Sequence, residues 1–433
     1  MFGNITAYKK NTFFLIINKF WTTLHGVIFL IIINLFLSDI EIGNYYLMVS
    51  VLSLQALFEI GFLNIVQASI AKKYFNKEKN YFNKKFFLKD FSRYKNYYFF
   101  VSVLFFIFTN LYLFIFIDIN EDLNFKFSYF IYVFFASCNI YLLPFFAAID
   151  GLNKISNSAI IKTLSSFLSL AVTFILLSLN FKLYSFGIAQ FFLATGNYFG
   201  LRTLGIFNFK PPIKFSLLRK TIQKTIKLQL KYLSVWISGY ILFSLYVPLT
   251  YKFYGPVQAG KIGLTISIFG FSLALGNSIV QARLPYFSKK FEQSKYKQCF
   301  DLLRRTSLIS TLVVLISTCF TVATFIILRQ LNLFEIYTNR VLENNMLIIF
   351  LIYTIINNYA GCLSLFTRSN NEEIFHKSSM QLALLTLIIF IITLNYGFIN
   401  FIKFPMLLFS IFIPFIYTYV FKKYYKTLIA NNI

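Results

Sequence analysis

Residues 307–328 read SLISTLVVLISTCFTVATFIIL, a run of 22 residues without a charged side chain. Such a run matches the roughly 20 apolar residues that a helix needs to cross the hydrocarbon core of a bilayer. Similar uncharged stretches recur from end to end of the 433-residue chain, of which 58% is hydrophobic and 13% charged. Soluble domains carry about 25% charged residues. The sequence therefore predicts an all-α polytopic membrane protein.

The apolar runs predict about 12 transmembrane helices. We place them near residues 13–37, 45–71, 97–117, 128–149, 160–180, 184–207, 230–251, 257–282, 307–328, 346–367, 379–397 and 404–421. The segment 184–207 is the richest in glycine and polar residues, and the loop that joins the last two helices is short.

The distribution of basic residues tests this count, because cytoplasmic loops collect Lys and Arg. If both termini lie inside, the inner segments hold 33 of the 41 basic residues and the outer segments hold seven. Most of the formal net charge of +26 is then a topology signal. A basic inner face also attracts anionic membrane lipids, and nucleic acid has no place among the expected partners.

A weak internal repeat predicts two lobes of six helices each. Ile65-Val66-Gln67-Ala68 recurs as Ile279-Val280-Gln281-Ala282, and the same offset superposes two helix pairs. Six helices in each half give both halves one orientation in the membrane. We therefore divide the chain into an N-terminal lobe, 1–207, a basic cytoplasmic linker, 208–229, and a C-terminal lobe, 230–433.

Motifs for soluble catalysis are missing from the sequence. It contains no P-loop, no GxSxG motif and no spacing typical of metal ligands. The four cysteines are far apart and do not suggest a disulfide framework. We expect neither enzymatic activity nor a cofactor or metal.

Two ionisable residues deep in predicted spans are candidates for ion coupling, because burying such a group in a membrane is costly. Glu59 is the only acidic residue deep in a span, with Gln55 one turn before it on the same face. His25 lies midway along the first span, where a modest pKa shift could couple transport to a proton gradient. For both residues a plain hydrogen bond between helices is an equally good interpretation.

Basic residues near the ends of spans are candidates for binding an anionic, phosphate-bearing substrate in a cavity. Lys231 begins a polar stripe on the seventh span that ends near Tyr240, and Lys261 begins a similar stripe on the eighth. Lys19 lies in the first span. The alternative for each lysine is that its long side chain reaches the lipid headgroups.

Several signatures resemble the Wzx-type polysaccharide flippases of the multidrug/oligosaccharidyl-lipid/polysaccharide (MOP) exporter superfamily. The most specific stretches are Trp236-Ile237-Ser238-Gly239-Tyr240 and Phe253-Tyr254-Gly255-Pro256-Val257-Gln258-Ala259-Gly260-Lys261-Ile262-Gly263-Leu264-Thr265. Supporting pieces are Gly43-Asn44-Tyr45-Tyr46, Glu59-Ile60-Gly61-Phe62, and Pro144 followed by Asp150-Gly151. The chain departs from the family pattern at Asp150, where Glu is frequent, and at Lys261, where Gln is usual.

The resemblance implies two six-helix lobes around a central cationic cavity that opens alternately to the two sides of the bacterial inner membrane, with both termini cytoplasmic. It implies an undecaprenyl-diphosphate-linked oligosaccharide as cargo, such as an O-antigen repeat unit used in lipopolysaccharide synthesis. A polysaccharide polymerase and a chain-length regulator would then be partners. In this reading Lys231, Lys261, Lys19 and Tyr240 line the substrate cavity.

Two other functions are weighed against a flippase. A multidrug cation antiporter of the same superfamily should carry acidic residues in its cavity, and this chain has one buried acid and several bases. A membrane O-antigen polymerase or glycosyltransferase should have a sizeable outer loop, yet the longest predicted outer segment, 329–345, has about 17 residues. Both comparisons favour a transporter of an anionic lipid-linked sugar.

Overall fold

The computed structural model describes residues 2–59, 63, 66–67, 70, 84–116, 123–152, 154–204, 230–231, 233–370 and 372–430. The predicted all-helical fold is confirmed, because the described residues form helices and short turns without any strand. The chain divides into two compact units, Met1–Leu233 and Ser234–Ile433. The predicted linker 208–229 lies outside the described residues.

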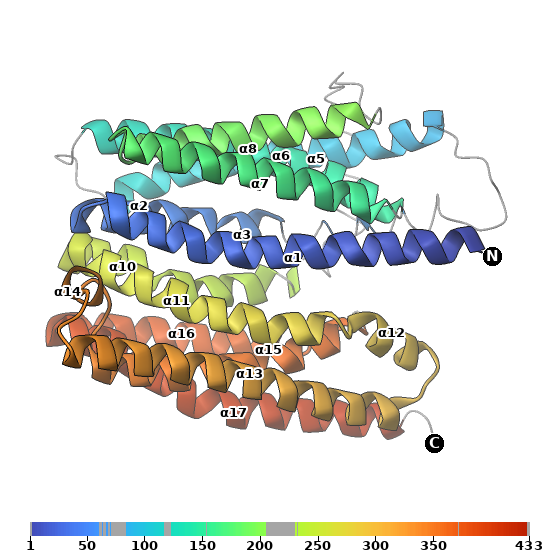
Figure 1. Cartoon of the computed structure of the whole chain (residues 1–433). Helices are drawn as coiled ribbons and strands as arrows, with labels where there is room; N and C mark the ends of the chain where they lie inside the picture. The colour runs from blue at the N-terminus through green and yellow to red at the C-terminus, as the bar shows by residue number, and fades with distance from the viewer. Residues whose placement is uncertain are drawn as a thin grey trace. The chain divides into compact units, whose positions relative to one another are not determined.

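Unit 1 is a bundle of long helices that lie side by side (Figure 1). Its helices are α1 (Phe2–Phe36), α2 (Asp39–Leu52), α3 (Gln55–Glu59), α5 (Lys84–Phe116), α6 (Leu123–Gly151), α7 (Ile155–Ser178) and α8 (Tyr184–Thr203). Helix α8 packs between α7 and α6; α1 covers the other side of α7, and α5 covers the other side of α6.

The helix Leu233–Ser244 starts at the boundary between the units and opens unit 2, and its last turn is the π-helix η1 (Tyr240–Ser244). It continues through α10 (Tyr246–Tyr254), α11 (Pro256–Gln281), α12 (Leu284–Glu292), α13 (Tyr296–Gln330), α14 (Glu335–Thr338), α15 (Asn344–Arg368), α16 (His376–Thr393), η2 (Leu394–Tyr396) and α17 (Phe398–Ala430). Helix α15 lies at the centre of this unit, because it packs on α11, α13 and α17.

Local sequence sets where two of these helices begin. Ser38 caps α2 in a capping box with Glu41, in which each side chain bonds the backbone N–H of the other residue. Gly255 separates α10 from α11 with a φ of 87°, a conformation that costs glycine little. Pro256 follows at the first position of α11, where its missing N–H leaves no bond unmade. The Tyr-Gly-Pro signature in the sequence is therefore the turn that reverses the chain.

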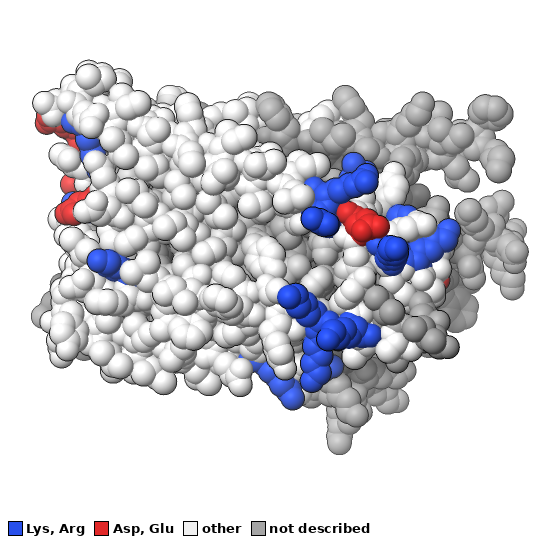
Figure 2. All heavy atoms as spheres, turned by 90° about the horizontal axis from the view of Figure 1, so that it is seen from below, with Lys and Arg blue, Asp and Glu red and all other residues white. Residues whose placement is uncertain are grey.

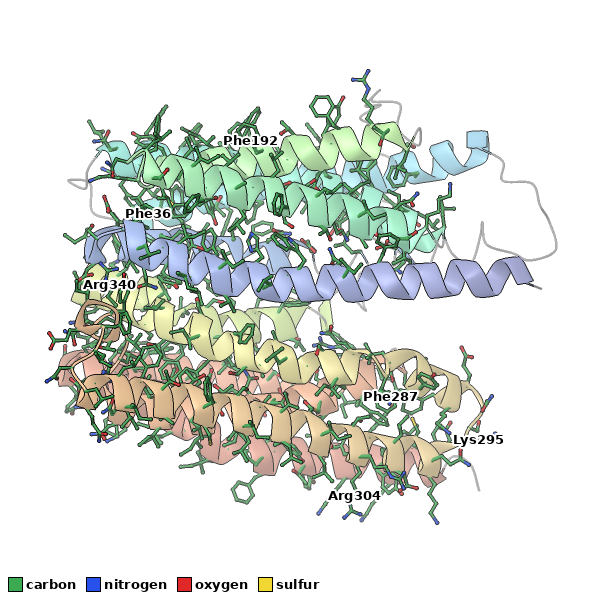
Figure 3. All side chains as sticks on the ribbon, in the orientation of Figure 1. Phe36, Phe192, Phe287, Lys295, Arg304 and Arg340 are labelled. Atoms are coloured by element: carbon green, nitrogen blue, oxygen red, sulfur yellow. The ribbon has the colours of Figure 1, made fainter. Side chains whose placement is uncertain are left out.

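The surface of unit 2 is that of a membrane protein. Helix α13 exposes large apolar side chains, including Ile316 (66% exposed) and Phe320 (74% exposed), which water would not favour. The face in Figure 2 has an uncharged middle, with Lys and Arg gathered mainly toward one end. Figure 3 places Lys295 and Arg304 at one end of unit 2 and Arg340 at the other. The uncharged belt between them is the part that lipid tails can cover.

Among the described residues, eight helices are long and apolar enough to cross a membrane, or nine if a bent pair counts as one span. The chain is thus a multi-pass membrane protein. The predicted spans 13–37, 45–71 and 184–207 are largely helical where described but are not among these eight. Part of α1, Leu24–Phe36, is a shorter apolar helix. Helix α8 carries amides that bond its neighbours, which lowers its hydropathy.

Two predicted helices differ in shape from the prediction. The span 45–71 was expected to be continuous, but α2 ends at Leu52 and a turn at residues 53–54 precedes α3. The hydroxyl of Ser53 there donates to the Ser50 carbonyl, and the backbone N–H of Leu57 bonds the Leu54 carbonyl. The span 230–251 bends by 44° at Leu245. An apolar run predicts that a segment crosses the membrane but not that it stays straight.

Candidate functional site

The predicted coupling residue His25 lies on the face of α1 that is turned toward α7. One turn earlier in α1, the indole N–H of Trp21 donates to the Ser166 hydroxyl at 2.6 Å. Two turns earlier, the Asn18 amide donates to the Thr163 hydroxyl at 2.8 Å. The imidazole itself stacks on Phe29 with ring centroids 5.9 Å apart and meets the edge of Trp21 at 6.0 Å. His25 is thus half-buried among aromatic rings, next to the hydrogen bonds that join α1 to α7.

The second coupling candidate, Glu59, ends the short helix α3. Its carboxylate accepts a hydrogen bond from the Gln55 amide, as their spacing predicts. The residue is half-buried, and its helix α3 packs on α5. Glu59 is therefore held within unit 1 by a neighbour on its own helix and faces α5.

The three lysines predicted to bind substrate lie in different surroundings. Lys231 is exposed and belongs to unit 1. Lys261 is half-buried on α11 of unit 2, where its backbone carbonyl accepts a hydrogen bond from the Thr265 hydroxyl at 2.7 Å. Lys19 lies on α1, and its side chain is outside the described residues. Lys231 and Lys261 thus belong to different units, and their meeting in one cavity stays a prediction.

Tyr240, the fourth predicted cavity residue, begins the π-helix η1 at the bend of unit 2. Its carbonyl accepts from the Leu245 N–H, five residues on, at 3.0 Å. Pro248 follows one turn later and has no N–H to give to the preceding turn. The hydroxyl of Tyr353 on α15 donates to the Leu242 carbonyl at 2.8 Å, so a side chain bonds the backbone of the irregular turn. Single π-turns inside α-helices occur frequently at functional sites.

A network of amides that sequence reasoning missed links α6 and α8 inside unit 1. The Asn139 amide donates to the Gln190 side-chain oxygen at 3.1 Å, and the Asn197 amide donates to the Asn139 oxygen at 3.2 Å. A hydrogen bond also joins Gln190 and Tyr132. Amides within apolar runs were the available signal, since such groups commonly join membrane helices.

The Asp150-Gly151 signature has a structural explanation at the end of α6. The Asp150 carboxylate accepts a hydrogen bond from the Ser158 hydroxyl on α7, and Lys162 on the same helix attracts it. A Cβ at Gly151 would lie 2.7 Å from the backbone oxygen of Gln67. Glycine is needed here because two backbones approach closely, and the acid ties α6 to α7.

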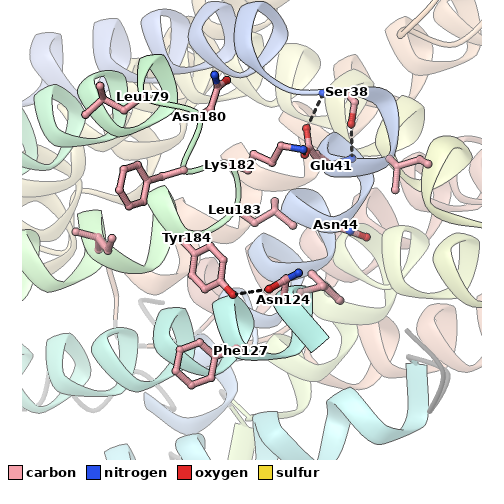
Figure 4. A pocket seen from close by; sticks show the side chains of 14 residues that line it. Ser38, Glu41, Asn44, Asn124, Phe127, Leu179, Asn180, Lys182, Leu183 and Tyr184 are labelled. Atoms are coloured by element: carbon pink, nitrogen blue, oxygen red, sulfur yellow. Dashed lines mark hydrogen bonds and ion pairs between the residues drawn. The ribbon is translucent and has the colours of Figure 1, made fainter. Parts of the chain in front are cut away.

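A pocket of about 1040 Å³ opens at the end of unit 1 where α7 ends and where α2, α6 and α8 begin. Figure 4 shows its labelled lining, in which amides, hydroxyls, rings and one ion pair come from three parts of the chain. Lys182 bonds Glu41 at 2.9 Å, and the Tyr184 hydroxyl donates to the Asn124 oxygen at 3.2 Å. A neighbouring pocket of about 500 Å³ shares Asn124, Phe127 and Tyr184 with it.

The Glu41–Lys182 pair stays charged at neutral pH. Burial raises the pKa of the Glu41 carboxyl, but hydrogen bonds from the Ser38 backbone and from Lys182 lower it more, so the net pKa is below its ordinary value of 4.5. The bond to Glu41 raises the pKa of the Lys182 ammonium. The pair therefore presents one full negative and one full positive charge to the pocket.

Several solved structures of MATE transporters have a similar shape. The MATE multidrug transporter DinF-BH matches with a TM-score of 0.64 at 14% identity, covering 96% of this chain and 95% of the other. The chain has the fold of a MATE transporter. The eukaryotic MATE transporter AtDTX14 matches with a TM-score of 0.58 at 14% identity, covering 98% and 99% of the two chains. An inward-facing MATE family transporter of the MOP superfamily gives 0.56 at 10% identity, covering 96% of each.

Sequence comparisons add nothing to this likeness, because neither protein-family models nor curated proteins match the chain. The MATE-like fold is therefore established by shape, at identities that carry no information about cargo. The charged residues of the chain distinguish possible cargoes better than these identities do. In the sequence of this chain, Glu59 is the only acid deep in a predicted span.

Proposed function

We propose that the protein is a flippase that moves an undecaprenyl-diphosphate-linked oligosaccharide from the inner to the outer leaflet of the bacterial inner membrane by alternating access. One observation carries this choice over export of organic cations. Glu59 is the only acid deep in a predicted span, and a neighbouring amide already donates to it. A cavity for a cationic drug needs carboxylates, because burying an unpaired cation is costly.

The bend in unit 2 supports movement between two openings. The helix Leu233–Ser244 meets α10 at 44° through the π-turn η1, with Pro248 just beyond it. A helix whose backbone bonds are already rearranged at one turn can change its angle there at a lower cost than a regular helix. Tyr353 holds the present arrangement through its bond to the Leu242 carbonyl.

The longest predicted outer segment favours a transporter over a polymerase. Arg329 donates to the backbone oxygens of Thr338 at 2.7 Å and of Val341 and Leu342 at 2.9 Å, and to the Asn344 side chain at 2.6 Å. One guanidinium thus closes residues 331–343 into a compact cap around the short helix α14. Such a cap leaves little backbone free to hold an acceptor sugar and catalytic groups.

In the proposed mechanism the diphosphate is bound by lysines, while the polyprenyl chain stays in lipid. Lys231, Lys261 and Lys19 are the proposed phosphate contacts. Tyr240, at the end of the polar stripe that begins with Lys231, is a further proposed cavity residue. Lysine suits this role as a compact point charge. Glu59 and His25 are the proposed coupling groups, with protons or another cation as the driver. A polymerase and a chain-length regulator would take the product on the outer side.

Deletion of the gene tests the proposed function. The extracted lipids should then contain accumulated single lipid-linked repeat units confined to the inner leaflet, and the surface glycan should be lost. Single units on the outer leaflet would instead indicate a polymerase. An unchanged glycan together with new sensitivity to cationic drugs would indicate a multidrug exporter.

Complementation with single variants tests the lysines. Lys261→Ala should restore less surface glycan than the wild type at limiting expression. Lys252→Ala is the matched control, because Lys252 lies nine residues earlier, is exposed near the end of α10 and should not touch cargo. Equal complementation by both variants would remove Lys261 from the site.

A further inference from the structure

We infer that the pocket at the end of unit 1 binds the sugar portion of the cargo. The oligosaccharide would occupy this pocket when it is on the outer side of the membrane. This inference rests on the proposed function and deepens it. The pocket volume of about 1040 Å³ lies at the upper end of the range for sites that bind small ligands, roughly 300–1,000 Å³. It can therefore hold several sugar rings.

The lining has the chemistry that recognises sugars. Asn44, Asn124 and Asn180 supply amides, each of which can both donate and accept, as sugar hydroxyls require. The rings of Phe127 and Tyr184 lie with centroids 6.3 Å apart and offer apolar faces to the C–H side of a sugar. Polar groups on several sides and rings between them match a ligand that is itself polar at its edges and apolar on its faces.

The charges of the pocket argue against other small ligands. Glu41 and Lys182 are the acid and the base of the larger pocket, and they bond each other at 2.9 Å. Their charges cancel, so the pocket has no excess of charge that would select an organic cation or a free anion. Each partner still has bonding capacity left, because a carboxylate accepts several hydrogen bonds and an ammonium donates three.

The wall that carries Lys182 is held in one conformation before any ligand arrives. The turn between α7 and α8 places Asn180 at φ 62° and Lys182 at φ 49°, the left-handed region that few residues adopt without support. Backbone hydrogen bonds support this turn, from the Asn180 N–H to the Leu177 carbonyl and from the Phe181 N–H to the Leu176 carbonyl, both at 3.0 Å. The ion pair with Glu41, which the capping box with Ser38 fixes, adds to them. A preformed site loses less free energy on binding, because it has less to order.

The location follows from the proposed topology. The pocket lies where α1 and α7 end, which the distribution of basic residues assigns to the outer side. A sugar held there has already crossed the membrane. The site would therefore favour release toward the outside and slow the return of the cargo.

Binding to the detergent-purified full chain tests the inference. The probe is the reducing oligosaccharide that mild acid releases from the host's lipid-linked repeat unit, titrated by calorimetry. We expect saturable binding, weakened about tenfold or more by Asn124→Ala and by Lys182→Met. Ser178→Ala is the matched control, because Ser178 is exposed at the same end but does not line the pocket, and it should bind as the wild type does.

A second measurement keeps Asn124 and Lys182 in place. Ile40 lines the pocket and is 55% exposed, so Ile40→Cys, in a background without the four native cysteines, should react with a membrane-impermeant maleimide added outside cells, and the oligosaccharide should slow this reaction. Ser178→Cys should react without protection. Wild-type protein that flips lipid-linked cargo but does not bind the free oligosaccharide would overturn the pocket assignment alone. Equal binding by all variants would do the same, whereas failure to flip any lipid-linked cargo would overturn the proposed function.

Discussion

Replacement of Gly276 by alanine should destabilise unit 2, because this residue lies where three helices meet. A Cβ there would lie 2.3 Å from a methyl group of Val314 on α13 and 2.6 Å from the side-chain oxygen of Asn358 on α15. Both neighbours are fully buried, and the Ser310 hydroxyl donates to the same Asn358 oxygen at 3.0 Å. The helices must therefore separate, or Asn358 must turn and lose its bond.

The size of the effect follows from three contributions. Overpacking of a core costs about 1–3 kcal/mol. A hydrogen bond between membrane helices is worth about 0.6 kcal/mol. Alanine regains up to about 1 kcal/mol of helix propensity relative to glycine. The expected net loss is about 1–3 kcal/mol, which for a unit of this size lowers the Tm by about 2–12 °C.

Gly270 on the same helix is the matched control, because a Cβ there meets nothing within 4 Å. Thermal unfolding of Gly276→Ala and Gly270→Ala in the same detergent measures the difference. We expect the Gly270 variant to melt at or above the wild-type temperature. Equal melting of the two variants would show that the packing of α11 on α13 and α15 has been misinterpreted.

Three further predictions concern the bend, the amide network and the ion pair. Pro248→Ala restores a backbone donor beside the bend, so it should slow translocation in vesicles while leaving the Tm unchanged or higher; an unaltered rate would remove the bend from the mechanism. Asn139→Leu leaves Gln190 and Asn197 without their shared partner and should lower the Tm by a few degrees, more than Asn110→Leu, whose described bond stays within its own helix. Because the pKa of Glu41 is lowered, oligosaccharide affinity should be constant from about pH 8 to about pH 5. It should fall only when the pH drops below 4.5, the ordinary pKa of this carboxyl, and a loss of affinity near neutral pH in calorimetry would contradict this.

The sequence predicted several local features of the helices and turns well. The uncharged run 307–328 lies inside α13, and the Gly255-Pro256 signature forms the turn between α10 and α11. These features are local, since the length of an apolar run and the conformational preferences of glycine and proline act within a few residues. Tertiary contacts are not needed to specify them.

The polar sites could be predicted only in part. Gln55 and Glu59 are neighbours on one helix, so their bond follows from spacing alone. The bond between Asn139 and Gln190 joins residues 51 positions apart, and the pair of Glu41 and Lys182 joins two helix ends. Nothing in the local pattern of either residue selects its partner, because packing of the helices decides which ends meet. The pocket depends on such pairs and was for that reason not predicted.

The most direct test of the proposed function is translocation by the purified protein in reconstituted vesicles. Lipid-linked oligosaccharide would be built into one leaflet, and its arrival in the other would be followed with a membrane-impermeant lectin. We expect the accessible fraction to rise with time in vesicles that contain the wild-type chain, to rise more slowly in vesicles with Lys261→Ala, and to stay constant in protein-free vesicles. An unchanged fraction with the wild-type chain, together with ion-driven transport of an organic cation by the same vesicles, would contradict the proposed function.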